Sequence, residues 1–153
     1  MVYIHYGAKS YDPDKVKPIE NIPYFSKPNG GFWASPIDAQ WGWIDWCRAE
    51  DFRYYEDNEF FKFTLKDNAK VLHIYSIKDL EDLPKINQEE QFSLNSVYLD
   101  FEKLKETYDA IELHLSEERD ILEDFWNRLY YKLYGWDCDS ILIMNPHVVI
   151  VVE

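Results

Sequence analysis

The sequence predicts an α+β domain of several short strands and three or four helices, and two patterns in its 153 residues carry this prediction. Strands are indicated by segments rich in β-branched and aromatic residues that alternate or run apolar. These segments are 2–6, 32–35, 60–65, 70–75, 108–115, 140–144 and 148–152. Helical patterns occur at 37–52, 77–83, 100–107 and 116–134. A chain of this length is expected to form a single domain, residues 1–153.

Residues that favour helix termini mark the ends of two of these helices. For 37–52, Pro36 stands at the first helical position and Asp38 in the first turn. For 116–134, which has the most regular apolar spacing, Ser116 can cap the amino end and Gly135 follows the last turn.

A long loop is expected between the first two strands, over residues 8–29. It contains prolines at positions 13, 18, 23 and 28, a spacing that no helix tolerates. Long ordered loops in small domains tend to be functional or to wrap a site. We therefore expect this loop to border the functional site.

Composition and charge exclude several classes of protein. Apolar residues make up 46%, charged residues 29% and aromatic residues 18%, which is typical of a globular chain with a heavy aromatic load. The 29 acidic residues outnumber the 16 basic ones, so the net charge is −13. This charge repels phosphate backbones and anionic membranes, which disfavours a nucleic-acid-coating surface and a membrane surface.

The cysteines and the apolar segments predict a cytoplasmic protein. Cys47 and Cys138 lie far apart, which suits two semi-buried thiols in a reducing compartment better than a disulfide framework. No segment approaches the roughly 18 apolar residues that a membrane span requires. The amino-terminal residues show no basic and apolar regions of a signal peptide.

Two segments combine polar or aromatic groups with glycine. His5 ends the first strand, and Gly7 would let a ligand or another backbone approach closely. The alternative is a histidine bonded to a neighbouring carbonyl. In the second segment, 30–43, flat aromatic rings and the Ser35 hydroxyl could hold a planar heterocycle. The alternative is that these rings fill the core.

A third segment places two acids beside a strongly apolar strand. Asp137 and Asp139 are one residue apart and are expected to point to the same side. Such a carboxylate can stabilise a developing cation or act as a general base. The alternative is a solvated turn that caps the preceding helix.

No metal site is expected, because the four histidines lack the spacing of zinc ligands. His73 and His114 stand within alternating strands, where a histidine is usually hydrogen-bonded on a core or sheet face. The sequence also lacks the motifs of phosphate-binding loops, dinucleotide-binding turns and serine nucleophiles.

Taken in order, the three segments resemble the signature segments of the ADP-ribosyltransferase superfamily. His5, Tyr6 and Gly7 resemble its first segment, a strand with histidine or arginine followed by glycine. Residues 30–35, Gly-Gly-Phe-Trp-Ala-Ser, resemble the second segment. Trp43 stands where the poly(ADP-ribose) polymerase branch has a tyrosine that stacks on nicotinamide. Residues 137–143 resemble the third segment, with aspartate in place of the usual glutamate.

The resemblance implies a fold of split antiparallel sheets around an NAD cleft, with a few flanking helices. It implies NAD as the co-substrate, no metal, and transfer of ADP-ribose to a macromolecular acceptor, with protein favoured over nucleic acid by the acidic charge. Asp139 would be the catalytic acid, although the register also leaves Asp137 and Ser140 open. The implied NAD contacts are His5, Tyr6, Gly7, Phe32, Trp33, Ser35 and Trp43.

Two other functions stay open. A protein of the same fold could bind NAD, ADP-ribose or a partner protein without catalysis, which the missing glutamate favours. An acidic chain could also act as a decoy that occupies the basic groove of a nucleic-acid-binding protein.

Overall fold

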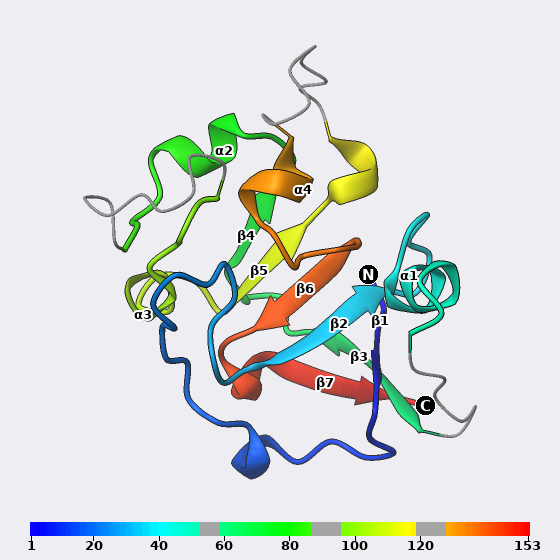
Figure 1. The fold of residues 1–153 in the computed structure, drawn as a ribbon. Helices are drawn as coiled ribbons and strands as arrows, with labels where there is room; N and C mark the ends of the chain where they lie inside the picture. The colour runs from blue at the N-terminus through cyan, green and yellow to red at the C-terminus, as the bar shows by residue number, and fades with distance from the viewer. Residues whose placement is uncertain (53–58, 87–95, 119–127) are drawn as a thin grey trace.

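The computed structural model describes residues 1–52, 59–86, 96–118 and 128–153, and it confirms the α+β class (Figure 1). All seven predicted strands are present, most of them trimmed by a residue or two. They are β1 (Tyr3–Tyr6), β2 (Phe32–Pro36), β3 (Phe60–Leu65), β4 (Val71–Ile74), β5 (Ala110–Leu113), β6 (Ser140–Ile143) and β7 (Val149–Val152). Within the described ranges, no helix is both long and apolar enough to cross a membrane.

The strands form one sheet in the order β4-β5-β6-β2-β1-β3-β7, in which only β4 and β5 run parallel. The sheet is strongly curled, as a contact across it demonstrates. The Tyr3 hydroxyl on β1 donates a hydrogen bond of 2.9 Å to Glu112 on β5, although β2 and β6 lie between them. In a flat sheet these strands would be about 14 Å apart, so the sheet must bend to join them.

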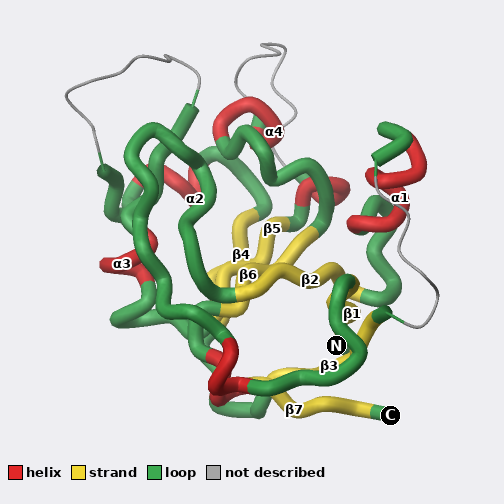
Figure 2. Tube along the Cα trace, turned by 60° about the horizontal axis from the view of Figure 1, so that its bottom comes forward, coloured by secondary structure: helices red, strands yellow, loops and turns green. Residues whose placement is uncertain are grey.

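Short helices and long loops surround the sheet (Figure 2). The helices are α1 (Trp43–Ala49), α2 (Lys78–Glu81), α3 (Phe101–Leu104) and α4 (Leu129–Lys132). The described ranges also contain the 3-10 turns η1 (Pro13–Lys15), η2 (Leu115–Glu117) and η4 (Pro146–Val148). α2 and α3 confirm the helices predicted at 77–83 and 100–107, although each is shorter than predicted.

The predicted start of the helix at 37–52 was wrong. Ser35 and Pro36 continue β2, and α1 begins only after Gly42, whose N–H donates 2.9 Å to the Asp45 carboxylate. Of the helix predicted at 116–134, residues 119–127 lie outside the described residues. The described parts are η2 and α4, and Ser116 lies within η2.

Each face of the sheet carries its own apolar core. One face, with Leu142 of β6, packs against the short helices and against Trp136, which is 1% exposed. The concave face holds the rings of Tyr3, Phe61 and Phe63 together with alanine and isoleucine side chains of the central strands. The two cysteines are free thiols and are fully buried, where the sequence predicted semi-buried ones.

Two glycines end the long irregular loop and let it return to the sheet. Gly30 and Gly31 both have positive φ, 80° and 61°. A Cβ on Gly30 would lie 2.0 Å from the Pro18 carbonyl oxygen, and one on Gly31 would lie 2.5 Å from that of Ile143. The chain therefore requires glycine here to enter β2 beside β6.

Candidate functional site: a cavity at the seam of the sheet

The shortest strand pairing of the described sheet is the one between β1 and β2. β1 pairs with β3 over all four of its residues, but with β2 only at Tyr3 and Ile4. Beyond Ile4 the two strands diverge, and a side chain replaces the missing ladder. His5 Nδ1–H donates a short hydrogen bond of 2.6 Å to the Trp33 carbonyl oxygen. We call this line between β1 and β2 the seam.

A cavity of about 320 Å³ lies at the seam, and we call it the seam cavity. All three segments that carry the family resemblance contribute to its wall. Six of the predicted NAD contacts line it: His5, Tyr6, Phe32, Trp33, Ser35 and Trp43. From the third segment, Asp137, Cys138 and Ser140 line it. Ligand pockets in proteins typically measure about 300–1,000 Å³, so the volume suits a small ligand group.

Aromatic rings held at fixed angles form much of the wall. Trp33 meets Trp136 edge-to-face at 4.6 Å, and Lys27 Nζ lies 4.8 Å from the centre of the Trp33 ring. Trp43 stacks on Trp46 at 5.2 Å, and its backbone N–H donates 3.0 Å to the Ser35 hydroxyl. Ring faces with a hydroxyl beside them suit a flat, partly polar ligand.

Two predicted site residues do not line the seam cavity. Gly7 ends β1 with φ of 106° and donates its N–H to the Glu59 carbonyl oxygen, 2.8 Å away. Asp139 is 5% exposed, and its carboxylate accepts hydrogen bonds from the Ser116 N–H at 2.8 Å and from the Ser116 hydroxyl. Asp139 therefore ties η2 to the start of β6, while Asp137 is the acid at the cavity.

Burial shifts the pKa of several groups at the cavity. It lowers the pKa of His5 below its ordinary value, which favours the neutral ring. Burial also raises the pKa of Asp137 and lowers that of Lys27, while the attraction between these two charges opposes both shifts. Burial raises the pKa of the Cys138 thiol to about 12, so this cysteine is not an activated nucleophile.

A second, more open cavity of about 530 Å³ adjoins the first, and His5 and Phe32 line both. Three exposed lysines stand on its wall: Lys9, Lys15 and Lys17. Asp12 also lines it and forms an exposed ion pair of 3.7 Å with Lys15. These lysines give the cavity wall a local positive charge in a chain of net charge −13, and such a charge attracts anions.

Sequence reasoning missed these lysines and also Lys27 and Trp136. All four lysines lie in the loop 8–29, and the sequence predicted that this loop would border a site. The proline-rich loop thus indicated the region of the site, but no residue in it belonged to a recognisable binding motif. Trp41, weighed as a stacking ring, instead donates its indole N–H 3.1 Å to the Asp137 carbonyl oxygen.

No protein-family model matches the chain, and comparison with curated proteins and with solved structures gives no significant match.

Proposed function

We propose that the chain is an NAD-dependent ADP-ribosyltransferase whose seam cavity binds the nicotinamide end of NAD. One observation carries the proposal: segments around positions 5, 33 and 137, far apart in the sequence, line one cavity. These are the segments whose order resembles the superfamily. The structure has one curled seven-stranded sheet, so the split sheets that the resemblance implies stay a prediction.

The two cavities suit the two ends of a bent dinucleotide. Trp33 and Trp43 offer faces to a flat nicotinamide ring, and the Ser35 hydroxyl lies beside them. The second cavity offers lysines to the diphosphate, and His5 stands between the cavities, where a ribose would pass. Because His5 Nδ1–H is engaged by Trp33, its Nε2 is an acceptor for a ribose hydroxyl.

In the proposed reaction, the bond between the ribose C1 and the nicotinamide nitrogen breaks, and its electron pair leaves with nicotinamide. The ribose then carries an oxocarbenium-like positive charge that a carboxylate can stabilise. A nucleophile of the acceptor attacks C1 and loses its proton. We assign the carboxylate role to Asp137 in place of Asp139, because Asp137 lines the cavity and Asp139 is bonded to Ser116.

The acceptor is proposed to be a macromolecule, with protein favoured over nucleic acid. The net charge of −13 repels a phosphate backbone and attracts a basic surface.

A second candidate function is binding of NAD or ADP-ribose without transfer. The observation that favours it is the hydrogen bonding of Asp139, which removes the acid closest to the family position from the cavity. Among the described residues that line the cavity, Asp137 is then the one carboxylate, and burial raises its pKa.

The test begins with a titration of the protein with NAD, followed by tryptophan fluorescence. We expect saturable quenching that is strongly reduced in Trp43→Phe and retained in the control Tyr134→Phe, whose ring is 67% exposed and does not line the cavity. Unchanged fluorescence across the titration, with no heat of binding in calorimetry, would overturn NAD binding. The acidic-decoy function would then be the favoured alternative.

The second step measures nicotinamide release. We expect Asp137→Asn to bind NAD with unchanged affinity. Its rate of nicotinamide release should fall by at least about 100-fold, because the substitution removes the stabilising charge. Equal release by Asp137→Asn and the unmodified protein would contradict the assigned role. Binding without any nicotinamide release, across a panel of basic protein acceptors, would favour the binding module.

A further inference from the structure

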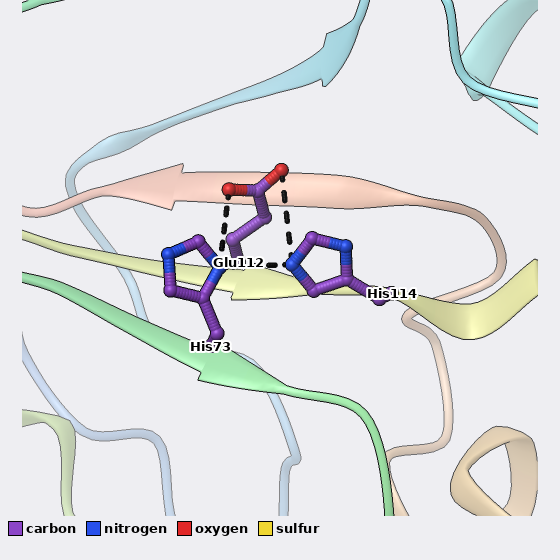
Figure 3. A group of neighbouring side chains, drawn as sticks. All are labelled: His73, Glu112 and His114. Atoms are coloured by element: carbon purple, nitrogen blue, oxygen red, sulfur yellow. Dashed lines mark hydrogen bonds and ion pairs between the residues drawn. The ribbon is translucent and has the colours of Figure 1, made fainter. Parts of the chain in front are cut away.

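Three potential metal ligands meet on the concave face of the sheet, away from the seam cavity. His73 on β4 pairs directly with Glu112 on β5, and His114 follows Glu112 by two positions. Residues in register across a parallel pair, and residues two apart on one strand, share a face. Figure 3 shows the three side chains, the His–Glu–His cluster, pointing toward one another.

The donor atoms of the cluster are spaced like the ligands of one ion. His73 Nδ1 and His114 Nε2 are 2.9 Å apart, His73 Nδ1 is 3.5 Å from Glu112 Oε2, and His114 Nε2 is 3.9 Å from Oε1. Bonds of about 2.0–2.2 Å around a tetrahedral zinc ion place neighbouring ligand atoms about 3.3–3.6 Å apart. The three measured distances lie on both sides of this value.

Glu112 is the strongest sign that the cluster binds something. Its side chain is 2% exposed, and Tyr3 donates to Oε2 at 2.9 Å. Oε1 is buried and has no hydrogen-bond partner among the residues that the structure describes. A buried carboxylate oxygen without a partner is costly, and such an atom needs an explanation.

The two facing imidazole nitrogens pose a related problem. At 2.9 Å, one of them must carry a proton and donate to the other, because two lone pairs in contact repel. That single proton lies between the rings and cannot also satisfy Glu112 Oε1. A divalent cation in its place would accept a lone pair from both rings and from the carboxylate at once.

The rings are also held in place. Tyr75 stacks on His114 with centroids 3.9 Å apart and planes 9° apart, and Tyr3 anchors the carboxylate. Metal sites use such supporting contacts to orient their ligands. The His73 side chain is 45% exposed, which gives an ion a path from solvent and leaves room for water.

We propose that His73, Glu112 and His114 form a binding site for a divalent transition-metal ion, Zn²⁺ in particular. Two imidazoles and one carboxylate are a ligand set that zinc uses with water in the fourth position. Imidazole nitrogen favours such an ion over Mg²⁺ or Ca²⁺, which prefer oxygen ligands. The proposal does not depend on the NAD proposal, because it uses none of the residues at the seam cavity.

The test is calorimetry of chelator-treated protein with ZnCl₂ alone. We expect one Zn²⁺ per chain, and affinity lowered by at least about 100-fold in His73→Ala and in His114→Ala, more than is lost with an outer hydrogen-bond partner. His147→Ala is the matched control, because His147 is exposed and lies outside the cluster. Retained affinity in both cluster variants, or no binding by the unmodified protein, overturns the site.

A second measurement avoids dependence on the folding of the variants. Co²⁺ bound to the unmodified protein should give visible absorption bands of a low-symmetry site and two paramagnetically shifted imidazole N–H signals in the proton NMR spectrum. Addition of Zn²⁺ should abolish both. A Co²⁺ spectrum without any shifted imidazole signals, those of the non-exchanging carbon-bound ring protons included, would exclude the two histidines as ligands.

Discussion

The seam cavity and the His–Glu–His cluster stand on the same sheet but are built in opposite ways. The cavity gathers large rings and a few polar groups from segments more than a hundred residues apart, at a place where two strands separate. The cluster needs only His73 and Glu112 in register on two strands and His114 directly after the second strand. The seam cavity thus depends on the separation of β1 and β2, whereas the His–Glu–His cluster depends on the pairing of β4 with β5.

Because of this difference, the two sites depend on different neighbouring residues. The cavity wall is also the apolar core, since Trp136 belongs to both. The cluster places a carboxylate in the concave core and relies on Tyr3, from the far side of the curled sheet, for one hydrogen bond. Substitutions should therefore affect the two sites separately, and four predictions test this.

The largest effect is expected for Trp136→Ala. This side chain is 1% exposed, contacts Trp33 and donates its indole N–H 2.7 Å to the Ser26 carbonyl oxygen. Its removal should lower the free energy of unfolding by about 3–5 kcal/mol and abolish NAD quenching. Urea unfolding measures the first effect, with Tyr134→Ala, 67% exposed, as a control within about 0.5 kcal/mol. Loss of Zn²⁺ binding in protein that remains folded would show that the sites are coupled.

Tyr3→Phe should have the next largest effect. The ring and its stacking on Phe63 are kept, but Glu112 Oε2 loses its donor. We expect the free energy of unfolding to fall by about 1–3 kcal/mol, because a buried acceptor is left without a partner. Added Zn²⁺ should recover part of this loss, which thermal unfolding with and without ZnCl₂ measures. Unchanged stability would mean that the carboxylate does not need the tyrosine.

His5 should make stability depend on pH. Burial lowers its pKa, so below its ordinary pKa of about 6.5 the unfolded chain takes up a proton that the folded chain does not. Stability is thus fully present above this pH and falls as the pH drops toward the folded pKa, by at most about 1.4 kcal/mol per pH unit. His5→Asn, which keeps a donor for Trp33, should have a shallower slope in urea unfolding than His147→Asn. Equal slopes would contradict the role of burial.

The smallest effect is expected for Lys17→Gln in the second cavity. An exposed lysine near a phosphate contributes about 0.2–1 kcal/mol, so NAD affinity should fall by up to about fivefold at low salt. The difference should vanish at high salt, because exposed charges are screened. Lys66→Gln, exposed beyond the end of β3, is the control. A loss that persists at high salt would indicate a direct hydrogen bond instead.

Much of the fold could be predicted from the sequence, because short strands show in local patterns of β-branched and aromatic residues. The start of α1 could not, since Pro36 is equally suited to the end of a strand, and only the pairing of β2 decides between them. Alternation placed Asp137 and Asp139 on one side, yet only Asp137 reaches the cavity. The Ser116 N–H that binds Asp139 comes from a distant turn.

The two cluster histidines also could not be assigned to a site from the sequence. His73 and His114 are 41 positions apart, so their spacing along the chain gives no metal signal. They meet because β4 and β5 pair in parallel with His73 opposite Glu112. Register between strands is set by the whole sheet, which local pattern does not reveal.

The seam also has a mechanical consequence. The pairing of β1 with β2 has the fewest partner positions of the described strand pairs, and beyond Ile4 the His5 imidazole bonds the two strands. Fewer bonds along one line lower the local cost of opening, so we expect the seam to open before the other strand pairs. A ligand bound at the seam would contact both strands and would therefore restrict their separation.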